Sequence, residues 1–119
     1  MNTQENRDKL AKAMGWSRRY NRIRDRDYWV LKDEGIYDFI VSYDDWNPYT
    51  SGDHCFMLLD RLDELNLNHC HHRTAIQDFE FSIVDSDWET LMVISASDLK
   101  TAICNAILQL LEERPEVFK

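Results

Sequence analysis

Glycine, proline and cysteine are all scarce in this chain of 119 residues, which has three glycines, two prolines and three cysteines. The three glycines stand far apart and form no phosphate-cradling loop, which argues against nucleotide hydrolysis. Without a linker, repeat or low-complexity tract, residues 1–119 are expected to form a single domain. The cysteines are odd in number and widely spaced, so we expect reduced thiols instead of the disulfide framework of a secreted protein.

Long hydrophobic runs are also missing. No apolar stretch approaches the length that crosses a bilayer, and the polar first six residues lack the apolar segment of a secretion signal. Hydrophobic residues nevertheless make up 44% of the chain and aromatic residues 12%, which is too many for a disordered tail. We therefore expect a globular protein in the cytoplasm, away from any membrane.

Positive charge is scarce and unevenly placed. The chain has 14 basic and 22 acidic residues, for a net charge of −8. Nine basic and four acidic residues fall within residues 1–32, a balance of +5, which leaves −13 for residues 33–119. The acidic bulk argues against general affinity for nucleic acid, because it repels phosphates everywhere except at a local basic patch. Such a patch is formed by five closely spaced arginines, namely Arg18, Arg19, Arg22, Arg24 and Arg26.

Three helices are predicted from capping residues and apolar spacing. The last has the clearest pattern, with apolar residues three and four apart over residues 99–111, an N-cap at Ser97 and an end before Pro115. The other two are a helix capped by Thr3 and stopped by a left-handed Gly15, and a helix from Ser51 or Asp53 to about Leu65. Trp16, which follows the first helix, is expected to fold back onto the core.

Two β-hairpins are predicted between these helices. Their strands are residues 28–31 with 36–41, and residues 79–83 with 88–94. Period-two alternation places Tyr37, Phe39 and Val41 on one side of the first hairpin. Short turns cannot supply parallel crossovers, so the order α-β-β-α-β-β-α predicts an α+β domain in which a four-stranded antiparallel sheet packs with the helices.

Several short motifs along the chain have a familiar order. They are Met14-Gly15-Trp16 at a helix end, Trp29, the turn Pro48-Tyr49-Thr50-Ser51, Leu58-Leu59-Asp60-Arg61-Leu62 in the next helix, and Ala102-Ile103-Cys104-Asn105-Ala106-Ile107-Leu108. In these the chain resembles the small bacteriophage ABA-sandwich domain family. The resemblance implies a phage or prophage origin, a bacterial host cytoplasm, an α-sheet-α layering and no catalytic residues to carry over. The arginine-rich and histidine-rich segments depart from that family.

Every histidine and two of the cysteines fall within residues 54–72. Imidazole and thiolate are the usual zinc ligands, so a metal-dependent enzyme is one interpretation. The spacing supports it poorly, because His69 and His71 on one face of a strand supply only two ligands and need His54 or Cys55 brought close by the fold. The other interpretation is a solvated loop that is rich in histidine, and we expect neither a metal nor another cofactor.

A nucleophilic cysteine is the second enzymatic alternative. Cys55 follows His54, and Cys70 lies between two imidazoles. The spacing of Cys55 with Leu58 and Leu62 makes it a core residue instead, and Cys104 is interpreted in the same way from its place in the last helix. A protein without catalysis is therefore favoured.

The five arginines allow two interpretations. Guanidinium groups bind phosphates, and Tyr20 or Tyr28 could stack on a base, so contact with nucleic acid is chemically possible. The arginines can instead pair with carboxylates such as Asp44, Asp45 or Asp53, or with those of a neighbouring copy in a homo-oligomer.

The loop after the first hairpin is aromatic and acidic. Tyr43, Trp46 and Tyr49 are large amphipathic residues of the type found at binding hot spots, and Asp44 and Asp45 lie among them. The alternative is that these rings fold over the sheet and close the core.

The favoured interpretation is a small non-enzymatic phage or prophage accessory protein that binds a macromolecular partner. The partner is expected to be a protein, met by the five arginines and by residues 43–46 and Tyr49, with the acidic body docking on a basic groove. Inhibition of a host defence or nucleic-acid-handling protein is a specific form of this hypothesis. The alternatives are the zinc or thiol enzyme and a toxin-neutralising immunity-type protein.

Overall fold

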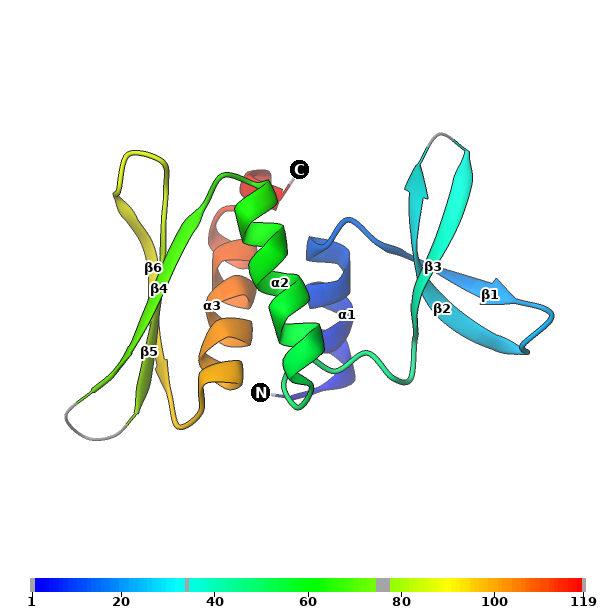
Figure 1. Cartoon of the computed structure of the whole chain (residues 1–119), viewed down its shortest axis with the longest axis horizontal. Coiled ribbons are helices and arrows are strands. Elements are labelled where there is room, and N and C mark those ends of the chain that lie inside the picture. The colour runs from blue at the N-terminus through cyan, green and yellow to red at the C-terminus, as the bar shows by residue number, and fades with distance from the viewer. Residues whose placement is uncertain (1, 34, 75–77, 119) are drawn as a thin grey trace.

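Two separate three-stranded antiparallel sheets stand at opposite ends of the molecule, and three helices lie between them (Figure 1). The computed structural model describes residues 2–33, 35–74 and 78–118. In chain order the elements are α1 (Gln4–Ala13), β1 (Ser17–Asn21), β2 (Arg26–Asp33), β3 (Ile36–Ser42), α2 (Gly52–Glu64), β4 (Asn68–Arg73), β5 (Phe79–Val84), β6 (Thr90–Ala96), α3 (Leu99–Glu113) and the 3₁₀ turn η1 (Pro115–Phe118). We call β1, β2 and β3 the first sheet and β4, β5 and β6 the second sheet. None of the described helices is long and apolar enough to cross a membrane.

The predicted four-stranded sheet is wrong. Both predicted hairpins are present, as β2 with β3 and β5 with β6, but each pairs with a third strand on its N-terminal side and the two hairpins belong to different sheets. The α-sheet-α layering is wrong as well, because the helices form the middle layer (Figure 1). The added strands β1 and β4 were missed because they bury almost no side chains and so lack apolar alternation.

The predicted N-cap of α1 is confirmed, α2 is capped by Ser51, one of the two residues predicted to start it, and the cap of α3 moves by one residue. Thr3 and Ser51 each accept a hydrogen bond from the amide three residues later, at 3.2 and 3.3 Å. In α3 the cap is Asp98 instead of Ser97, and its carboxylate accepts from the amide of Thr101 at 2.9 Å and from the hydroxyl at 2.7 Å. An ionised cap at this position also complements the helix dipole.

Gly15 ends α1 in the left-handed conformation, with φ of +83°, as predicted. The Gly15 amide donates to the carbonyl of Lys12 at 2.9 Å, and the Trp16 amide donates to the carbonyl of Ala11 at 3.3 Å. These are the two hydrogen bonds of a Schellman motif. This turn sends the Trp16 ring back onto the core, where it meets the Trp46 ring edge-on at 4.9 Å.

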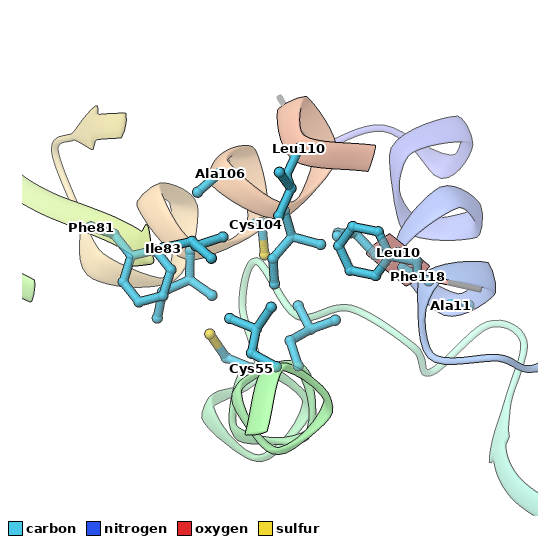
Figure 2. Close-up of a cluster of buried hydrophobic side chains, with 14 of the residues drawn as sticks. Leu10, Ala11, Cys55, Phe81, Ile83, Cys104, Ala106, Leu110 and Phe118 are labelled. Carbon is cyan, nitrogen blue, oxygen red and sulfur yellow. The ribbon is translucent and has the colours of Figure 1, made fainter. Parts of the chain in front are cut away.

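The main core lies between the second sheet and the helices. α3 covers the inner face of that sheet, where Phe81 and Ile83 are fully buried. Cys55 of α2 and Cys104 of α3 turn their sulfur atoms into the same cluster (Figure 2). The prediction that both cysteines are core residues is therefore confirmed.

The first sheet meets the helical layer only at its base. Trp29 of β2 is 1% exposed and its ring centroid lies 5.6 Å from that of Tyr43, while Trp46 is fully buried beside them in the core. Beyond this junction the sheet projects from the helices (Figure 1), and none of the described helices packs along either of its faces. Away from the buried side chains of Tyr28, Trp29 and Val30, both faces are thus available for contacts outside the molecule.

Candidate binding surface on the first sheet

Strand register sorts the side chains of the first sheet onto two faces. Residues that pair across antiparallel strands share a face, and neighbours along a strand alternate. What we call the cationic face carries Arg19, Arg26, Tyr28, Val30, Lys32, Tyr37 and Phe39. What we call the tryptophan face carries Arg18, Tyr20, Asp27, Trp29, Leu31, Ile36, Asp38 and Val41.

A β-bulge in β3 corrects one prediction. Simple alternation placed Val41 on the same side as Tyr37 and Phe39. The register shifts between Trp29 and Val30 of β2, so that Val41 pairs with Trp29 and Phe39 pairs with Val30. The extra residue of the bulge therefore sends the ring of Phe39 to the opposite face from Val41.

The cationic face carries charge of one sign. Within the described part of the strands, its charged side chains are Arg19, Arg26 and Lys32, whereas the carboxylates of Asp27 and Asp38 lie on the tryptophan face. The guanidinium carbon of Arg19 and the ammonium nitrogen of Lys32 lie 4.0 and 5.7 Å from the centroid of the Tyr37 ring. These cation–π contacts order two cations without neutralising them.

Arg18 is held differently from the other arginines. Its Nε and Nη2 atoms donate to a carboxylate oxygen of Asp27 at 2.9 and 2.5 Å, and its guanidinium lies 3.7 Å from the centroid of the Tyr43 ring. The hydrogen bond to Asp27 raises the pKa of Arg18. Arg18 thus ties β1 to the junction with the helices, and its role is structural.

Within the described residues, the other four arginines of the cluster keep their charge unpaired. Among the residues that the structure describes, Arg18 alone of the five has a carboxylate within ion-pair distance. Arg24 donates to the hydroxyl of Tyr28 at 3.4 Å, which leaves its charge in place. The pairing considered for Asp44, Asp45 and Asp53 is not formed within this part of the chain.

A pocket of about 500 Å³ opens on the cationic face. Arg24 lines it from the β1–β2 turn and Arg26 from the start of β2. Tyr28 and Phe39 supply aromatic walls, and Asp45 lines it from the turn after β3. Its volume falls within the range of small-ligand sites. The pocket therefore combines two cations, an aromatic surface and one carboxylate.

The tryptophan face and the hairpin ends expose apolar side chains. Leu31 is 39% exposed, Ile36 67%, Tyr20 56%, and Ile23 in the β1–β2 turn 95%. The Tyr20 hydroxyl donates to Asp25, so this ring is fixed in place. Sequence reasoning did not select Leu31 or Ile36, whose apolar character is also what a buried strand would show.

Two of the predicted contact residues lie in the core. Trp46 is fully buried, and Tyr49 is 6% exposed and donates from its hydroxyl to Asn105 at 3.2 Å. Burial raises the pKa of Tyr49 to about 12. Tyr43 is half-buried with its hydroxyl donating to Asp8 at 3.0 Å. The alternative that these rings close the core is thus the one found, while Asp44 and Asp45 remain exposed.

The histidines do not converge. Nδ1 of His54 accepts from the amide of Asn47 at 3.0 Å near the start of α2, whereas His69 lies 3.7 Å from Asp63 near the end of that helix. Nine residues separate His54 from Asp63, which is about 13 Å along a helix axis. His69 and His71 share one face of β4, where they pair across the strands with Ile83 and Phe81 respectively. The described residues contain no group of three or more potential metal ligands.

Two of the three thiols are buried in the core. Cys55 and Cys104 are 4% and 0% exposed. The hydrogen bond with Cys55, together with burial, raises the pKa of the Cys104 thiol. Cys70 is exposed on the outer face of the second sheet, away from the core pair. Neither buried thiol is accessible to a substrate, so neither is a candidate nucleophile.

A larger groove of about 870 Å³ runs between α1 and α3. It is lined by both signs of charge, from Lys9, Glu112 and Glu113, and by the aliphatic side chains of Leu108 and Leu111. This mixture matches an ordinary solvated seam between two helices, and no side chain in it points to a particular ligand.

Comparison with known proteins finds no family model, no curated protein and no solved structure that matches the chain. The resemblance to the phage family accordingly stays a prediction. The first sheet, whose two faces differ in charge and in apolar exposure, is the strongest candidate surface among the described residues.

Proposed function

We propose that this protein is a non-enzymatic binding module that contacts a protein partner through the tryptophan face and hairpin ends of its first sheet. One observation carries the proposal. Four of the eight large apolar side chains that the described residues expose lie on the tryptophan face or in the β1–β2 turn, namely Tyr20, Ile23, Leu31 and Ile36. Exposed apolar residues scattered singly are ordinary, but their concentration on one projecting element is typical of an interaction surface.

The charged side chains around these residues indicate which charges the partner carries. Arg22 and Asp25 lie in the β1–β2 turn beside Ile23, and of the two only Asp25 has an internal partner, the Tyr20 hydroxyl, among the described residues. Arginine and tyrosine are enriched at binding hot spots. Arg22 therefore suits a carboxylate of the partner, and Asp38, which is exposed on the tryptophan face, suits a cation. The −13 balance of residues 33–119 disfavours acidic partners at the rest of the surface.

The biological role that we propose is that of a phage or prophage accessory protein. Its support is the sequence resemblance together with the small size and the two-sided projecting sheet. A host protein that handles nucleic acid or acts in defence is the partner that this role implies. Occupation of that protein's surface, with no chemical step, would be enough to inhibit it.

The proposal can be tested with matched surface variants. Wild-type protein, Ile36→Glu, Leu31→Glu and Val93→Glu are immobilised and exposed to lysate of a bacterial host. Val93 is the control, because it is 47% exposed on the outer face of the second sheet. We expect a partner that wild type and Val93→Glu retain and that both first-sheet variants lose, with an affinity of the purified complex that falls as salt rises.

The opposite pattern would refute the proposal. If every retained protein binds Ile36→Glu and Leu31→Glu as well as it binds wild type, the first sheet is not the contact surface. Loss of binding with Val93→Glu alone would move the interface to the second sheet. Circular dichroism of each variant shows that the fold is retained, which the exposure of all three positions favours.

A further inference from the structure

The pocket on the cationic face has features that protein docking on the other face does not use. It holds about 500 Å³ between the β1–β2 turn and the turn that follows β3. Arg24, Arg26, Phe39 and Asp45 line it together. Two cations, an exposed ring and a carboxylate at one small site indicate a ligand that is anionic at one end and a hydrogen-bond donor at another.

The arginines of the pocket are positioned before any ligand arrives. The side-chain oxygen of Asn21 accepts from the amides of Ile23 and Arg24 at 2.9 and 3.2 Å, which fixes the turn that carries Arg24. The Arg24 guanidinium then donates to the Tyr28 hydroxyl at 3.4 Å. Arg26 follows at the start of β2, and neither arginine has a carboxylate partner among the residues described. Both forks remain able to bind phosphate oxygens.

The aromatic wall is also braced. Tyr28 is 8% exposed and packs against Phe39 in an edge-to-face arrangement, with centroids 5.5 Å apart and planes at 86°. Phe39 is 48% exposed, so part of its surface is free on the pocket side. A fixed, half-exposed ring next to two arginines is suited to stacking with a planar base.

Asp45 adds a negatively charged hydrogen-bond acceptor to the pocket. Its backbone amide donates to the carbonyl and hydroxyl oxygens of Ser42, at 3.1 and 3.3 Å, which fixes the turn. Its carboxylate lines the pocket and has no ion-pair partner within the described chain. An ionised carboxylate only accepts hydrogen bonds, so it selects for N–H or O–H donors and repels a second phosphate nearby.

We propose that this pocket binds a nucleotide unit. The phosphate lies on Arg24 and Arg26, the base stacks on Phe39, and Asp45 accepts hydrogen bonds from the base or from ribose hydroxyls. The unit comes from a free mononucleotide or from a single strand of nucleic acid. Arg19 and Lys32 continue the positive charge along the same face, where the neighbouring phosphates of a strand would lie. This inference goes beyond protein docking and does not depend on it.

Two probes separate the two sources. The first is a fluorescein-labelled single-stranded RNA of about eight nucleotides, within the span of single-strand sites, followed by anisotropy. The second is the mononucleotides AMP and GMP, followed by NMR shifts of the Arg24, Arg26 and Phe39 amides. The variants are Arg24→Gln, Arg26→Gln and Phe39→Ala. Arg114→Gln and Phe56→Ala are controls, since they remove the same groups from exposed sites outside the first sheet.

We expect each pocket variant to weaken binding by about tenfold, which corresponds to loss of a stacked base or a charged hydrogen bond, and the controls to bind as wild type does. An effect of Arg19→Gln on the RNA but not on the mononucleotides identifies a strand as the source. Binding of mononucleotides alone identifies a free nucleotide. The proposal is overturned if neither probe binds at about 1 mM, or if the control variants weaken binding as much as the pocket variants do. Loss of protein capture by Ile36→Glu has no bearing on this result, so the two proposals fail independently.

Discussion

At the scale of single residues, two buried tryptophans at the base of the first sheet differ in one hydrogen bond. Nε1 of Trp46 donates to the carbonyl of Arg7 at 2.9 Å. Nε1 of Trp29 is buried and has no partner among the described residues. Both rings are buried, so solvent exposure does not distinguish them.

Replacement of each ring by phenylalanine tests this difference. We expect Trp46→Phe to lower the free energy of unfolding by about 1–3 kcal/mol more than Trp29→Phe does, because it strands the Arg7 carbonyl, whereas Trp29→Phe removes a donor that was already unpaired. Urea denaturation of both variants measures the two losses. Equal losses would show that Nε1 of Trp29 has a partner in solution.

His54 makes stability depend on pH. Burial lowers the pKa of His54, and the nearby carboxylates of Asp53 and Asp45 oppose this only in part. Its Nδ1 accepts from the Asn47 amide, which only the neutral ring can do. The His54 ring therefore binds a proton more tightly in the unfolded chain than in the folded protein. The contribution of His54 to the free energy of unfolding is present above the unfolded pKa of about 6.5 and is lost as the pH falls below that value.

The variant His54→Asn keeps an acceptor near the Nδ1 position and cannot titrate. We expect its unfolding midpoint to fall less than that of wild type between pH 8 and pH 5, with the divergence beginning near the unfolded histidine pKa of about 6.5. Urea midpoints of both proteins across this range give the difference, in which the other histidines cancel. Parallel curves would mean that the His54 ring is as easily protonated in the folded protein as in the unfolded chain.

At the scale of elements, the helices were predictable because their signals are local. Thr3, Ser51 and Gly15 act within one turn of the chain, and the apolar stripe of α3 needs only itself. β1 and β4 gave no such signal, because exposed arginines and histidines form strands only by backbone pairing with a neighbour. Sequence alone likewise could not reveal that the hairpins belong to separate sheets, which depends on long-range packing.

The candidate surface was predicted only in part, because some of its features are local in the sequence and others depend on strand pairing. The cluster of arginines was visible in the sequence, but the faces on which they lie depend on the register and on the bulge in β3. Phe39 and Asp45 meet Arg24 only in the folded sheet. Trp46 and Tyr49, which have the composition of hot-spot residues, are used to bury the junction instead.

The start of α3 offers a paired test of capping. Asp98 accepts from the Thr101 amide. Burial opposes its ionisation, but the hydrogen bonds with Thr101 and the positive charge of Lys100 together lower the pKa of Asp98. We expect Asp98→Ala to cost about 1 kcal/mol at neutral pH and Ser97→Ala to cost far less. Thermal unfolding at pH 7 and at pH 3 measures both. The cost of Asp98→Ala should shrink at acid pH, because the Asp98 carboxylate stabilises the start of α3 most when it is ionised. A larger loss of stability from Ser97→Ala than from Asp98→Ala would place the cap at Ser97.

At the scale of the whole molecule, charge and architecture divide the chain in the same way. The residues with a positive balance form α1 and most of the first sheet, and the acidic remainder forms most of the main core and the second sheet. The helices separate the two sheets, so the arginine-rich sheet stands at one end of a molecule that is 51 Å long (Figure 1). Both proposals depend on this sheet standing outside the core.

Amide hydrogen exchange of the free protein tests that claim most directly. Strands that no other layer covers open more readily than strands packed under a helix. We therefore expect the amides of β1, β2 and β3 to exchange well before those of β5 and α3. First-sheet amides that stay protected as long as those of β5 and α3 would show that the sheet is packed into the core, and would contradict the account.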